Sequence, residues 1–264
     1  MTESMTVRQG QSRVFLRENA GGRARAGTVS HGMAKPTNIV ILTGAGISAE
    51  SGLATFRGPG GLWEGRRVED VCTPEALAHD PVLVHSFYDA RRAALTTVAP
   101  NAAHVALARL DAAWPGDLLI VTQNVDDLHE RAGATRLLHM HGELQSALCA
   151  ACGVRTEWSG NLPPEEVCPN CDTPALRPDI VFFGEMPYEM ERIEQALANA
   201  DLFVSIGTSG AVYPAAGFVQ GARHHGADTL ELNLEASAGS AYFAETRTGP
   251  ATLLVPDWVD QMLA

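Results

Sequence analysis

Short apolar runs alternate with longer mixed stretches along the chain from residue 38 onward. The runs predict buried β-strands, because they are rich in Val, Ile and Leu and are bounded by turn-forming residues. The predicted strands cover 38–43, 117–122, 201–206 and 228–233, with a short extended piece at 136–140. The intervening stretches predict a short helix after the first strand and helices at 74–97, 101–113, 125–131, 187–199, 211–224 and 256–263. This alternation predicts an α/β fold, a doubly wound parallel sheet covered by helices on both faces.

A glycine-rich turn, Gly44 to Ser48, follows the first predicted strand and opens a short helix. Bare backbone N–H groups at the positive end of a helix are suited to a diphosphate, so the turn indicates a nucleotide site. A nicotinamide dehydrogenase would place a strand ending in Asp or Glu about 20 residues further on. Residues 55–63 instead contain several glycines and Pro59 and predict a long functional loop. The dehydrogenase interpretation is therefore disfavoured.

Small or polar residues follow every predicted strand, and the carboxyl ends of parallel strands meet at one edge of a sheet. These residues are Gly44, Ala45 and Gly46; Gln123, Asn124, Val125 and Asp126; His139 to Gly142; Gly207, Thr208 and Ser209; and Asn233, Leu234 and Glu235. A turn or a helix cap would explain any one set alone. Five sets together predict a ligand site at this edge.

Four of the five cysteines form two pairs, Cys149 with Cys152 and Cys168 with Cys171, with fifteen residues between the pairs. This spacing predicts a closed tetrahedral zinc site that is structural rather than catalytic. The segment between the pairs is short and polar, so metal binding would supply its folding energy. Disulfides are the alternative, which the lack of a secretion signal disfavours. We expect the fifth cysteine, Cys72, to be an ordinary buried thiol.

The length, charge and apolar content of the chain limit the kinds of partner that it could bind. A chain of 264 residues suits one large domain with an insertion, and residues 1–36 read as a flexible leader. The net charge of −12 argues against a nucleic-acid surface. The apolar runs fall well short of the ~20 residues of a membrane span. We therefore expect a cytoplasmic enzyme, monomeric, with no nucleic-acid or membrane partner.

The motifs together resemble the sirtuin family of NAD-dependent protein deacylases, and within it the bacterial CobB-like branch. The resemblance runs from about residue 38 to the C-terminus. It rests on Gly44 to Ser48, Thr55 to Arg57, Thr122 to Asp126, His141-Gly142 and Gly207 to Ser209. It implies a catalytic domain over 37–264: a Rossmann-type large part, a helical insert at about 60–100 and a zinc module at about 144–178. NAD and an acyl-lysine protein would enter the cleft between the parts from opposite sides.

The resemblance also implies which residues hold NAD. They are Gly44, Ala45, Gly46, Ser48, Phe56, Arg57, Trp63, Gln123, Asn124, Val125, Asp126, Gly207, Thr208, Ser209, Asn233, Leu234, Glu235 and Ala251. Gln123, Asn124 and Asp126 would line the nicotinamide and ribose pocket. Phe56 would shield the reactive ribose carbon from water. Ala251 would lie near the adenine.

His141 and Asn124 are the implied catalytic residues. The acyl oxygen would attack the ribose carbon and expel nicotinamide, after which His141 would act as the base that activates a ribose hydroxyl. The products would be free lysine, nicotinamide and O-acyl-ADP-ribose. We expect His139 to point away from His141 and to be structural. We expect His104, His129 and His224, on predicted helices, to be hydrogen-bonded core or turn residues.

Tyr88 and Arg91 lie three residues apart on a predicted helix and so share one face. A phenol beside a guanidinium is a natural receptor for a carboxylate. The pair resembles that of sirtuins that prefer succinyl- or malonyl-lysine, and Cys72 stands where small residues widen the acyl pocket in this branch. We expect activity on succinyl- and acetyl-lysine. The alternatives are an NAD-dependent oxidoreductase, a mono-ADP-ribosyl transferase and a non-catalytic module, either an NAD sensor or a zinc-ribbon scaffold. The presence of His141, Asn124 and Asp126 disfavours the non-catalytic module.

Overall fold

Six parallel strands form the main sheet of the described part of the chain, which covers residues 35–55, 62–63 and 65–264 in a computed structural model. The strand order is β11-β10-β9-β1-β4-β5. The strands are β1 (Ile39–Thr43), β4 (Leu118–Thr122), β5 (Leu137–His139), β9 (Leu202–Ile206), β10 (Asp228–Asn233) and β11 (Glu245–Thr248). β1 and β4 are buried at every position, as their unbroken apolar runs predict. The predicted doubly wound α/β class is confirmed.

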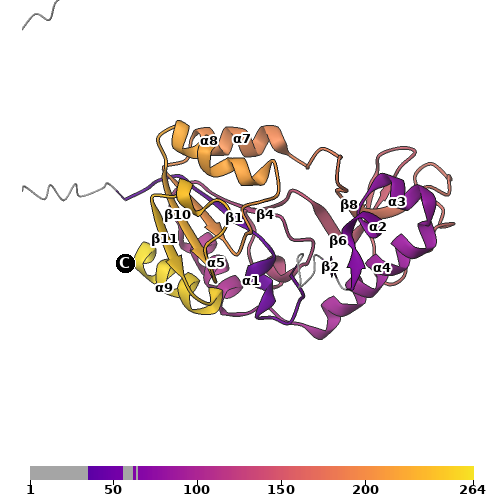
Figure 1. The fold of residues 1–264 in the computed structure, drawn as a ribbon, viewed down its shortest axis with the longest axis horizontal. Helices are drawn as coiled ribbons and strands as arrows, with labels where there is room; N and C mark the ends of the chain where they lie inside the picture. Colours follow the sequence, from indigo (N-terminus) through magenta and orange to yellow (C-terminus); the bar gives the residue numbers. More distant parts are fainter. Residues whose placement is uncertain (1–34, 56–61, 64) are drawn as a thin grey trace, which may run out of the picture. The chain divides into compact units, whose positions relative to one another are not determined.

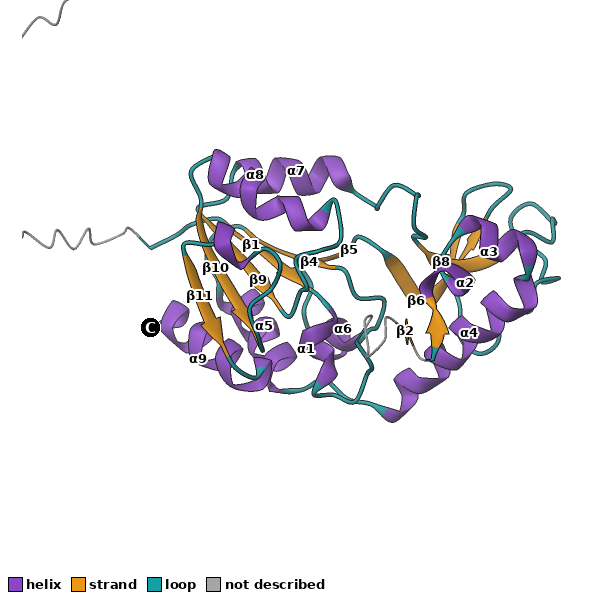
Figure 2. Cartoon of the chain, in the orientation of Figure 1, coloured by secondary structure: helices purple, strands orange, loops and turns teal. Residues whose placement is uncertain are grey.

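Helices cover both faces of this sheet (Figures 1 and 2). On one face, α5 (Ala102–Ala113) and α9 (Ala251–Leu263) pack in a core that contains Ile39 and Ile41 of β1. On the other face, α7 (Met190–Ala198) and α8 (Phe218–His224) pack in a core that contains Val40 and Leu42. Successive residues of β1 thus enter different cores, because side chains alternate between the faces of a strand.

The order of the strands reverses at β1. The chain leaves β1 for β4 on one side and later returns to β9 on the other side, with both neighbours parallel to β1. Thr43 lies level with Thr122 and with Ile206, so three strands end together. The short helices α1 (Ala45–Ala49) and α6 (Leu128–Arg131) begin just beyond these ends. Such a reversal opens a crevice at the carboxyl ends of the strands, where α/β proteins bind ligands.

A second, antiparallel sheet has the strand order β7-β6-β8, with β6 (Gly142–Cys149), β7 (Arg155–Glu157) and β8 (Leu176–Ile180). The helices α2 (Val68–Val71), α3 (Pro74–His79) and α4 (Pro81–Ala94), with the 3₁₀ turn η2 (Leu95–Thr97), lie beside it (Figure 2). Tyr88 of α4 packs with Leu144, Ile180 and Phe182 in one buried cluster. The remaining elements are the hairpin β2 (Leu62–Trp63) and β3 (Arg66–Arg67) and the 3₁₀ turns η3 (Ala215–Gly217) and η4 (Ser240–Tyr242).

Several helix bounds differ from the sequence prediction: the helices predicted at 211–224 and 125–131 are shorter, and the helix predicted at 256–263 is longer. Two further differences have a clear physical reason. The helix predicted over 74–97 is interrupted at Asp80, whose backbone leaves the helical region with φ −140° and ψ 77° and whose carboxylate accepts the N–H of Leu83 at 2.9 Å. Pro81 then starts α4, because proline lacks an N–H donor and suits the first turn of a helix. Strand β11 was not predicted, since its sequence Glu-Thr-Arg-Thr is polar and it pairs only with β10 at the sheet edge.

Candidate active site

The turns after β1 and β9 touch through their backbones at the strand reversal. The N–H of Gly46 donates to the carbonyl of Gly207 at 2.8 Å. A Cβ on Gly46 would lie 2.7 Å from the Cα of Gly207, and Gly207 itself has φ +62°. The contact therefore requires glycine on both sides, and it leaves a side-chain-free surface at the start of α1. This surface fits the diphosphate of a nucleotide.

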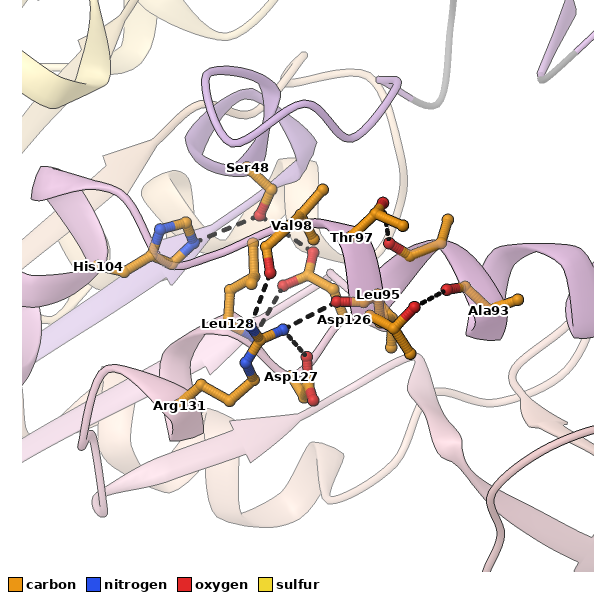
Figure 3. A network of polar contacts seen from close by, with 12 residues as sticks. Ser48, Ala93, Leu95, Thr97, Val98, His104, Asp126, Asp127, Leu128 and Arg131 are labelled. Carbon is orange, nitrogen blue, oxygen red and sulfur yellow. Dashed lines mark hydrogen bonds and ion pairs between the residues drawn. The ribbon is translucent and has the colours of Figure 1, made fainter.

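Ser48 of α1 is the centre of a buried polar network behind that turn (Figure 3). Its hydroxyl donates to Asp126 at 3.0 Å and accepts from the side-chain amide of Asn124 at 3.1 Å. Its remaining lone pair faces Nε2 of His104 at 3.3 Å, while Nδ1 of His104 accepts the N–H of Asn101 at 3.3 Å. These partners require the neutral Nε2–H tautomer of His104. Burial lowers the pKa of His104 to about 4 and raises the pKa of Asp126.

A second buried histidine supports the ends of β1 and β4. Nε2 of His129 lies 3.0 Å from the hydroxyl of Thr43, which donates to Thr122 at 2.9 Å. The rings of His129 and His104 meet edge to face at 5.0 Å, and burial holds the pKa of His129 well below its usual value. The prediction that both are hydrogen-bonded core residues is confirmed. Their role beneath the candidate site was missed, since Ser48 and His104 lie 56 residues apart.

Arg131 of α6 fastens the same loop to the helical insert. Its guanidinium donates to the carbonyls of Leu95 at 3.0 Å and Val98 at 2.6 Å, and it lies 3.4 Å from Asp127 (Figure 3). The segment that carries Asp126 is thereby tied to the end of α4 and η2 as well as to α1.

Three consecutive carbonyls of the loop after β4 accept hydrogen bonds from residues 139–144. Gln123 accepts from Nδ1 of His141 at 3.2 Å, and Asn124 accepts from Nδ1 of His139 at 3.0 Å. Val125 accepts from the N–H of Leu144 at 2.9 Å. The expectation that His139 points away from His141 was wrong. The strand ends at His139 and residues 140–141 form a turn, which brings both rings to the same loop.

His141 is placed to act as a base. Because Nδ1–H donates to Gln123, the neutral ring keeps its Nε2 lone pair available. Burial lowers the pKa of His141, although the bond to Gln123 opposes this shift, so the ring is neutral at neutral pH. Gly142 then turns the chain into β6 with φ +85°, and a Cβ there would lie 2.0 Å from the carbonyl oxygen of Asp179.

A cavity of about 350 Å³ lies between α4, β6 and the loop that carries Asp126. Arg91 and Asp126 both line it, together with apolar side chains that include Phe87 and Leu144. Tyr88 lies behind this wall: it is fully buried, its ring stacks on Phe182 at 6.0 Å, and its hydroxyl lies near the thiol of Cys72.

Two buried polar groups behind this wall, Tyr88 and Cys72, are neutral beside the guanidinium of Arg91. Burial raises the pKa of Tyr88 well above its usual value and raises the pKa of Cys72, so both groups are neutral proton carriers. The charge of Arg91 opposes both shifts, which places its guanidinium near the two side chains.

The other predicted cofactor residues lie around the same sheet edge. The side-chain amide of Asn233 donates to the carbonyl of Thr208 at 2.7 Å, and Ser209 accepts the N–H of Ala238 at 3.1 Å. Leu234 and Glu235 are exposed, and Ala251 opens α9 just past the end of β11. Phe56 and Arg57 lie outside the described residues, as does the side chain of Trp63.

The four paired cysteines converge on one point, with all four sulfurs within 4.8 Å of one another. Sγ of Cys149 and Cys171 are 3.7 Å apart, and those of Cys152 and Cys168 are 3.8 Å apart. A tetrahedron with Zn–S bonds of about 2.3 Å has sulfur–sulfur edges of about 3.8 Å, so the group fits Zn²⁺ and not disulfides. The N–H of Val154 and the amide of Asn170 lower the pKa of Cys152 to about 6, which favours its thiolate.

Arg92 joins this module to the cavity wall. Its buried guanidinium donates from Nε to the carbonyl of Leu144 at 2.6 Å and from Nη1 to Asp89 at 2.6 Å and to the carbonyl of Gly160 at 2.9 Å. Asp89 in turn accepts the N–H of Leu162 at 2.9 Å. Arg92 was not predicted as a linking residue, because Asp89 lies one turn away on the same helix but Leu144 and Gly160 are far away in sequence.

Comparisons with known proteins agree with this geometry. The Sir2 family model matches residues 44–214. An NAD-dependent protein deacylase of Escherichia coli strain K12 is 52% identical over 256 residues, covering 96% of this chain and 88% of that protein. One from Salmonella typhimurium strain LT2 is 54% identical over 234 residues, covering 88% of this chain and 86% of that protein.

Solved structures give the same result. A crystal structure of a Sir2 homologue with NAD superimposes with a TM-score of 0.79 at 35% identity, covering 86% of this chain and 90% of that one. The family model matches more than half of the chain. The fold that carries the glycine contact, the polar network and the four cysteines is also that of a solved Sir2 homologue. The chain belongs to the Sir2 family.

Proposed function

We propose that this protein is an NAD-dependent protein-lysine deacylase that removes acetyl and succinyl groups, giving free lysine, nicotinamide and O-acyl-ADP-ribose. The observation that carries the proposal is the cavity that Asp126 and Arg91 both line. Asp126 belongs to the polar network beside the glycine turn, and Arg91 belongs to the helix that carries Tyr88. One cavity thus joins a predicted cofactor residue, Asp126, to a predicted acyl-binding residue, Arg91. The relatives named as deacylases support the same activity.

The glycine turn and the strand-end residues would hold NAD. Gly44, Gly46 and Gly207 would accommodate the diphosphate, Ser209, Asn233 and Glu235 would bind ribose hydroxyls, and Asn124 and Asp126 would contact the nicotinamide half. When bound, NAD supplies the electrophilic ribose carbon and the ADP-ribose that accepts the acyl group. Phe56, Arg57 and Trp63 remain predicted cofactor residues.

The role of the protein is to position groups and to move one proton. Ser48 holds Asn124 and Asp126 in fixed rotamers through a network that is already complete, so little reorganisation is needed on binding. His141 would take a proton from a ribose hydroxyl at its Nε2 atom. Its neutral state at neutral pH is the state that a general base requires.

The zinc module would have a structural role, because four thiolates close the coordination shell and leave no position for a substrate. We propose that the catalytic domain spans 37–264, with the helical insert at about 60–100 and the zinc module at about 144–178. A cytoplasmic location and a monomeric state remain predictions, as do the flexible leader at 1–36 and the exclusion of nucleic-acid and membrane partners. In the described part of the chain, helices fall short of the length and apolarity needed to cross a bilayer.

Mass spectrometry of one peptide carrying acetyl- or succinyl-lysine, with and without NAD, tests the activity. NAD-dependent loss of the acyl group with formation of the matching O-acyl-ADP-ribose is the expected result. Modification of the protein or peptide by ADP-ribose without deacylation would favour the transferase alternative. A change in nicotinamide absorbance would favour the oxidoreductase.

The acyl preference is tested by Tyr88→Phe combined with Arg91→Met. We expect this variant to lose desuccinylation far more than deacetylation, since only the succinyl group carries a carboxylate for the pair to bind. Arg66→Met is the matched control, because Arg66 is a second cation that lines the same cavity. Equal loss of both activities in the double variant, or a selective loss in the control, would refute the receptor role of Tyr88 and Arg91.

A further inference from the structure

His139 has two hydrogen-bond partners, and both are acceptors. Nδ1 lies 3.0 Å from the carbonyl oxygen of Asn124, and Nε2 lies 2.6 Å from a carboxylate oxygen of Glu130. A neutral imidazole carries one N–H, so either neutral tautomer would set a bare nitrogen lone pair against an oxygen lone pair. Only the imidazolium donates to both partners at once.

The surroundings of the ring stabilise that cation. The imidazole is 7% exposed, and Glu130 of α6 and Glu143 of β6 both face it. Burial lowers the pKa of His139, but the bond to Glu130 and the two carboxylates outweigh this effect, so the pKa is raised overall. Asp126 in the loop and His129 in α6 are the other titratable groups that interact with the ring.

His139 and His141 therefore differ in charge although they lie two residues apart. His141 has one acceptor partner, Gln123, which a neutral ring satisfies while leaving Nε2 free. His139 has two acceptor partners and leaves no ring nitrogen free. One histidine is arranged to take a proton, and the other is arranged to keep one.

The carbonyl that His139 binds belongs to Asn124, whose side chain reaches Ser48. The neighbouring backbone is fixed as well: the N–H of Asn124 donates to the hydroxyl of Thr122 at 3.0 Å, and the carbonyl of Val125 accepts from Leu144. Without the donor at Asn124 the peptide between residues 124 and 125 could rotate. That rotation would move the side chains of Asn124 and Asp126 together.

We propose that His139, oriented by Glu130, is a positioning residue that clamps the Asn124 carbonyl and thereby sets the nicotinamide-side residues Asn124 and Asp126. The inference rests on the proposed function for its catalytic meaning, whereas the protonation of His139 is a property of the folded protein alone. As the pH rises through the pKa of His139 in the folded protein, the ring loses one N–H and the clamp loses a bond. The reaction should then be fastest between the pKa of His141 and the higher pKa of His139.

The direct test is a pH titration of the His139 Cε1–H resonance by NMR in the zinc-loaded protein, assigned by its loss in His139→Gln. We expect an inflection above 6.5 in the wild type, the ordinary value for histidine, and a lower one in Glu130→Gln. Glu143→Gln is the matched control, because Glu143 faces the ring without a hydrogen bond to it, and its shift should be smaller. A wild-type His139 that is neutral at pH 6.5 would overturn the proposal.

Kinetics test what the clamp does. The alkaline limb of kcat/KM for NAD should move to lower pH in Glu130→Gln. His139→Gln keeps an N–H donor for Asn124 and should retain most activity, whereas His139→Ala should lose roughly tenfold or more in kcat/KM for NAD, since small misplacements of positioned groups are costly. The KM for the peptide should stay unchanged in both variants. Equal activity of the Gln and Ala variants would contradict the positioning role.

A possible metal-binding group also lies here, since the ligand atoms of Glu130, His139 and Glu143 are within 4.8 Å of one another. A metal would need a bare nitrogen on His139. Stoichiometric binding of added Zn²⁺ beyond the four-cysteine site, with deprotonation of His139 in the NMR titration, would overturn the proposal in favour of a metal site. Absence of acyl-lysine turnover in the wild type would refute the proposed function but leave the titration result standing.

Discussion

The edge of the parallel sheet and the four-cysteine module obtain their structure in different ways. The sheet edge rests on two extensive cores, one on each face, and its polar groups bind one another through Ser48 and Thr43. The module has a small buried cluster that includes two of its own cysteines. Burial of apolar surface stabilises the first region, whereas the second depends on a metal. The comparison shows that the predicted cofactor site can be held by the hydrophobic cores of the sheet, while the neighbouring four-cysteine module depends on zinc.

Removal of zinc should give the largest effect. Cys168→Ser, or a strong chelator, should unfold the module and abolish deacylation, because metal binding supplies the folding energy of this segment. Most of the far-UV circular dichroism should remain, since the parallel sheet does not contain the site. Cys72→Ala is the control that loses a cysteine but should keep one zinc per chain. Loss of the whole fold on chelation would show that the two regions are not independent.

Gly46→Ala should be the most damaging single change at the sheet edge. The added methyl would meet the backbone of Gly207 at 2.7 Å, where no side chain can move away. We expect a loss of about 2–3 kcal/mol in the free energy of unfolding, measured with urea, and a raised KM for NAD. Gly221→Ala in α8 has open space around its Cβ position and should stabilise the protein by up to about 1 kcal/mol. An unchanged stability in Gly46→Ala would mean that the two turns separate readily.

Ser48→Ala tests whether the network is held as a unit. The change leaves the amide of Asn124 and Nε2 of His104 without their shared acceptor, at a cost of about 1–3 kcal/mol. We expect kcat/KM for NAD to fall on the order of 100-fold, with little change in the peptide KM. Ser51→Ala, in the same short stretch, removes only a bond to the side-chain amide of Asn101 and touches neither Asn124 nor Asp126; it should cost less than about 1 kcal/mol and keep activity. Similar activities of the two variants would count against Ser48 as the centre.

Mild acid should destabilise both regions by protonating different groups: His104 at the sheet edge and the cysteine thiolates in the module. His104 has a pKa of about 4 in the folded protein and about 6.5 when unfolded, so the unfolded state binds more protons below pH 6.5. Stability is therefore lost as the pH falls from about 6.5 towards 4, on the order of 2 kcal/mol by pH 5.

A urea series at pH 7 and pH 5, with zinc release followed by a coloured chelator, separates the two regions. The urea midpoint should fall before zinc is released if His104 dominates. In His104→Gln the pH dependence of the midpoint should be smaller. A midpoint that follows zinc release step for step would assign the acid sensitivity to the thiolates instead.

Much of the fold and of the candidate site could be predicted because the signals are local. The apolar runs of β1, β4, β9 and β10, the glycine turn and the spacing of the cysteines each lie within a few residues. The strand ends could be assigned to one edge because all six strands of the main sheet are parallel. The features that were not predicted depend on residues that lie far apart in the sequence. Glu245–Thr248 forms a strand only because β10 offers it an edge, and the roles of Arg92 and His104 depend on partners far away in sequence.

The direction of His139 is a different kind of error. The alternation of side chains along a strand does not decide it, because β5 ends at His139 and residues 140–141 form a turn. The two partners of its ring, Asn124 and Glu130, come from the loop after β4 and from α6, and no spacing within residues 136–141 indicates them.

Arg92 binds the wall of the acyl cavity at Leu144 and the loop of the zinc module at Gly160 with one guanidinium. Metal retention and cavity occupancy are therefore linked equilibria. By thermodynamic reciprocity, if zinc strengthens the binding of an acyl-lysine peptide by some factor, the peptide must strengthen the binding of zinc by the same factor. An enzyme saturated with peptide should then bind its metal more tightly than the free enzyme.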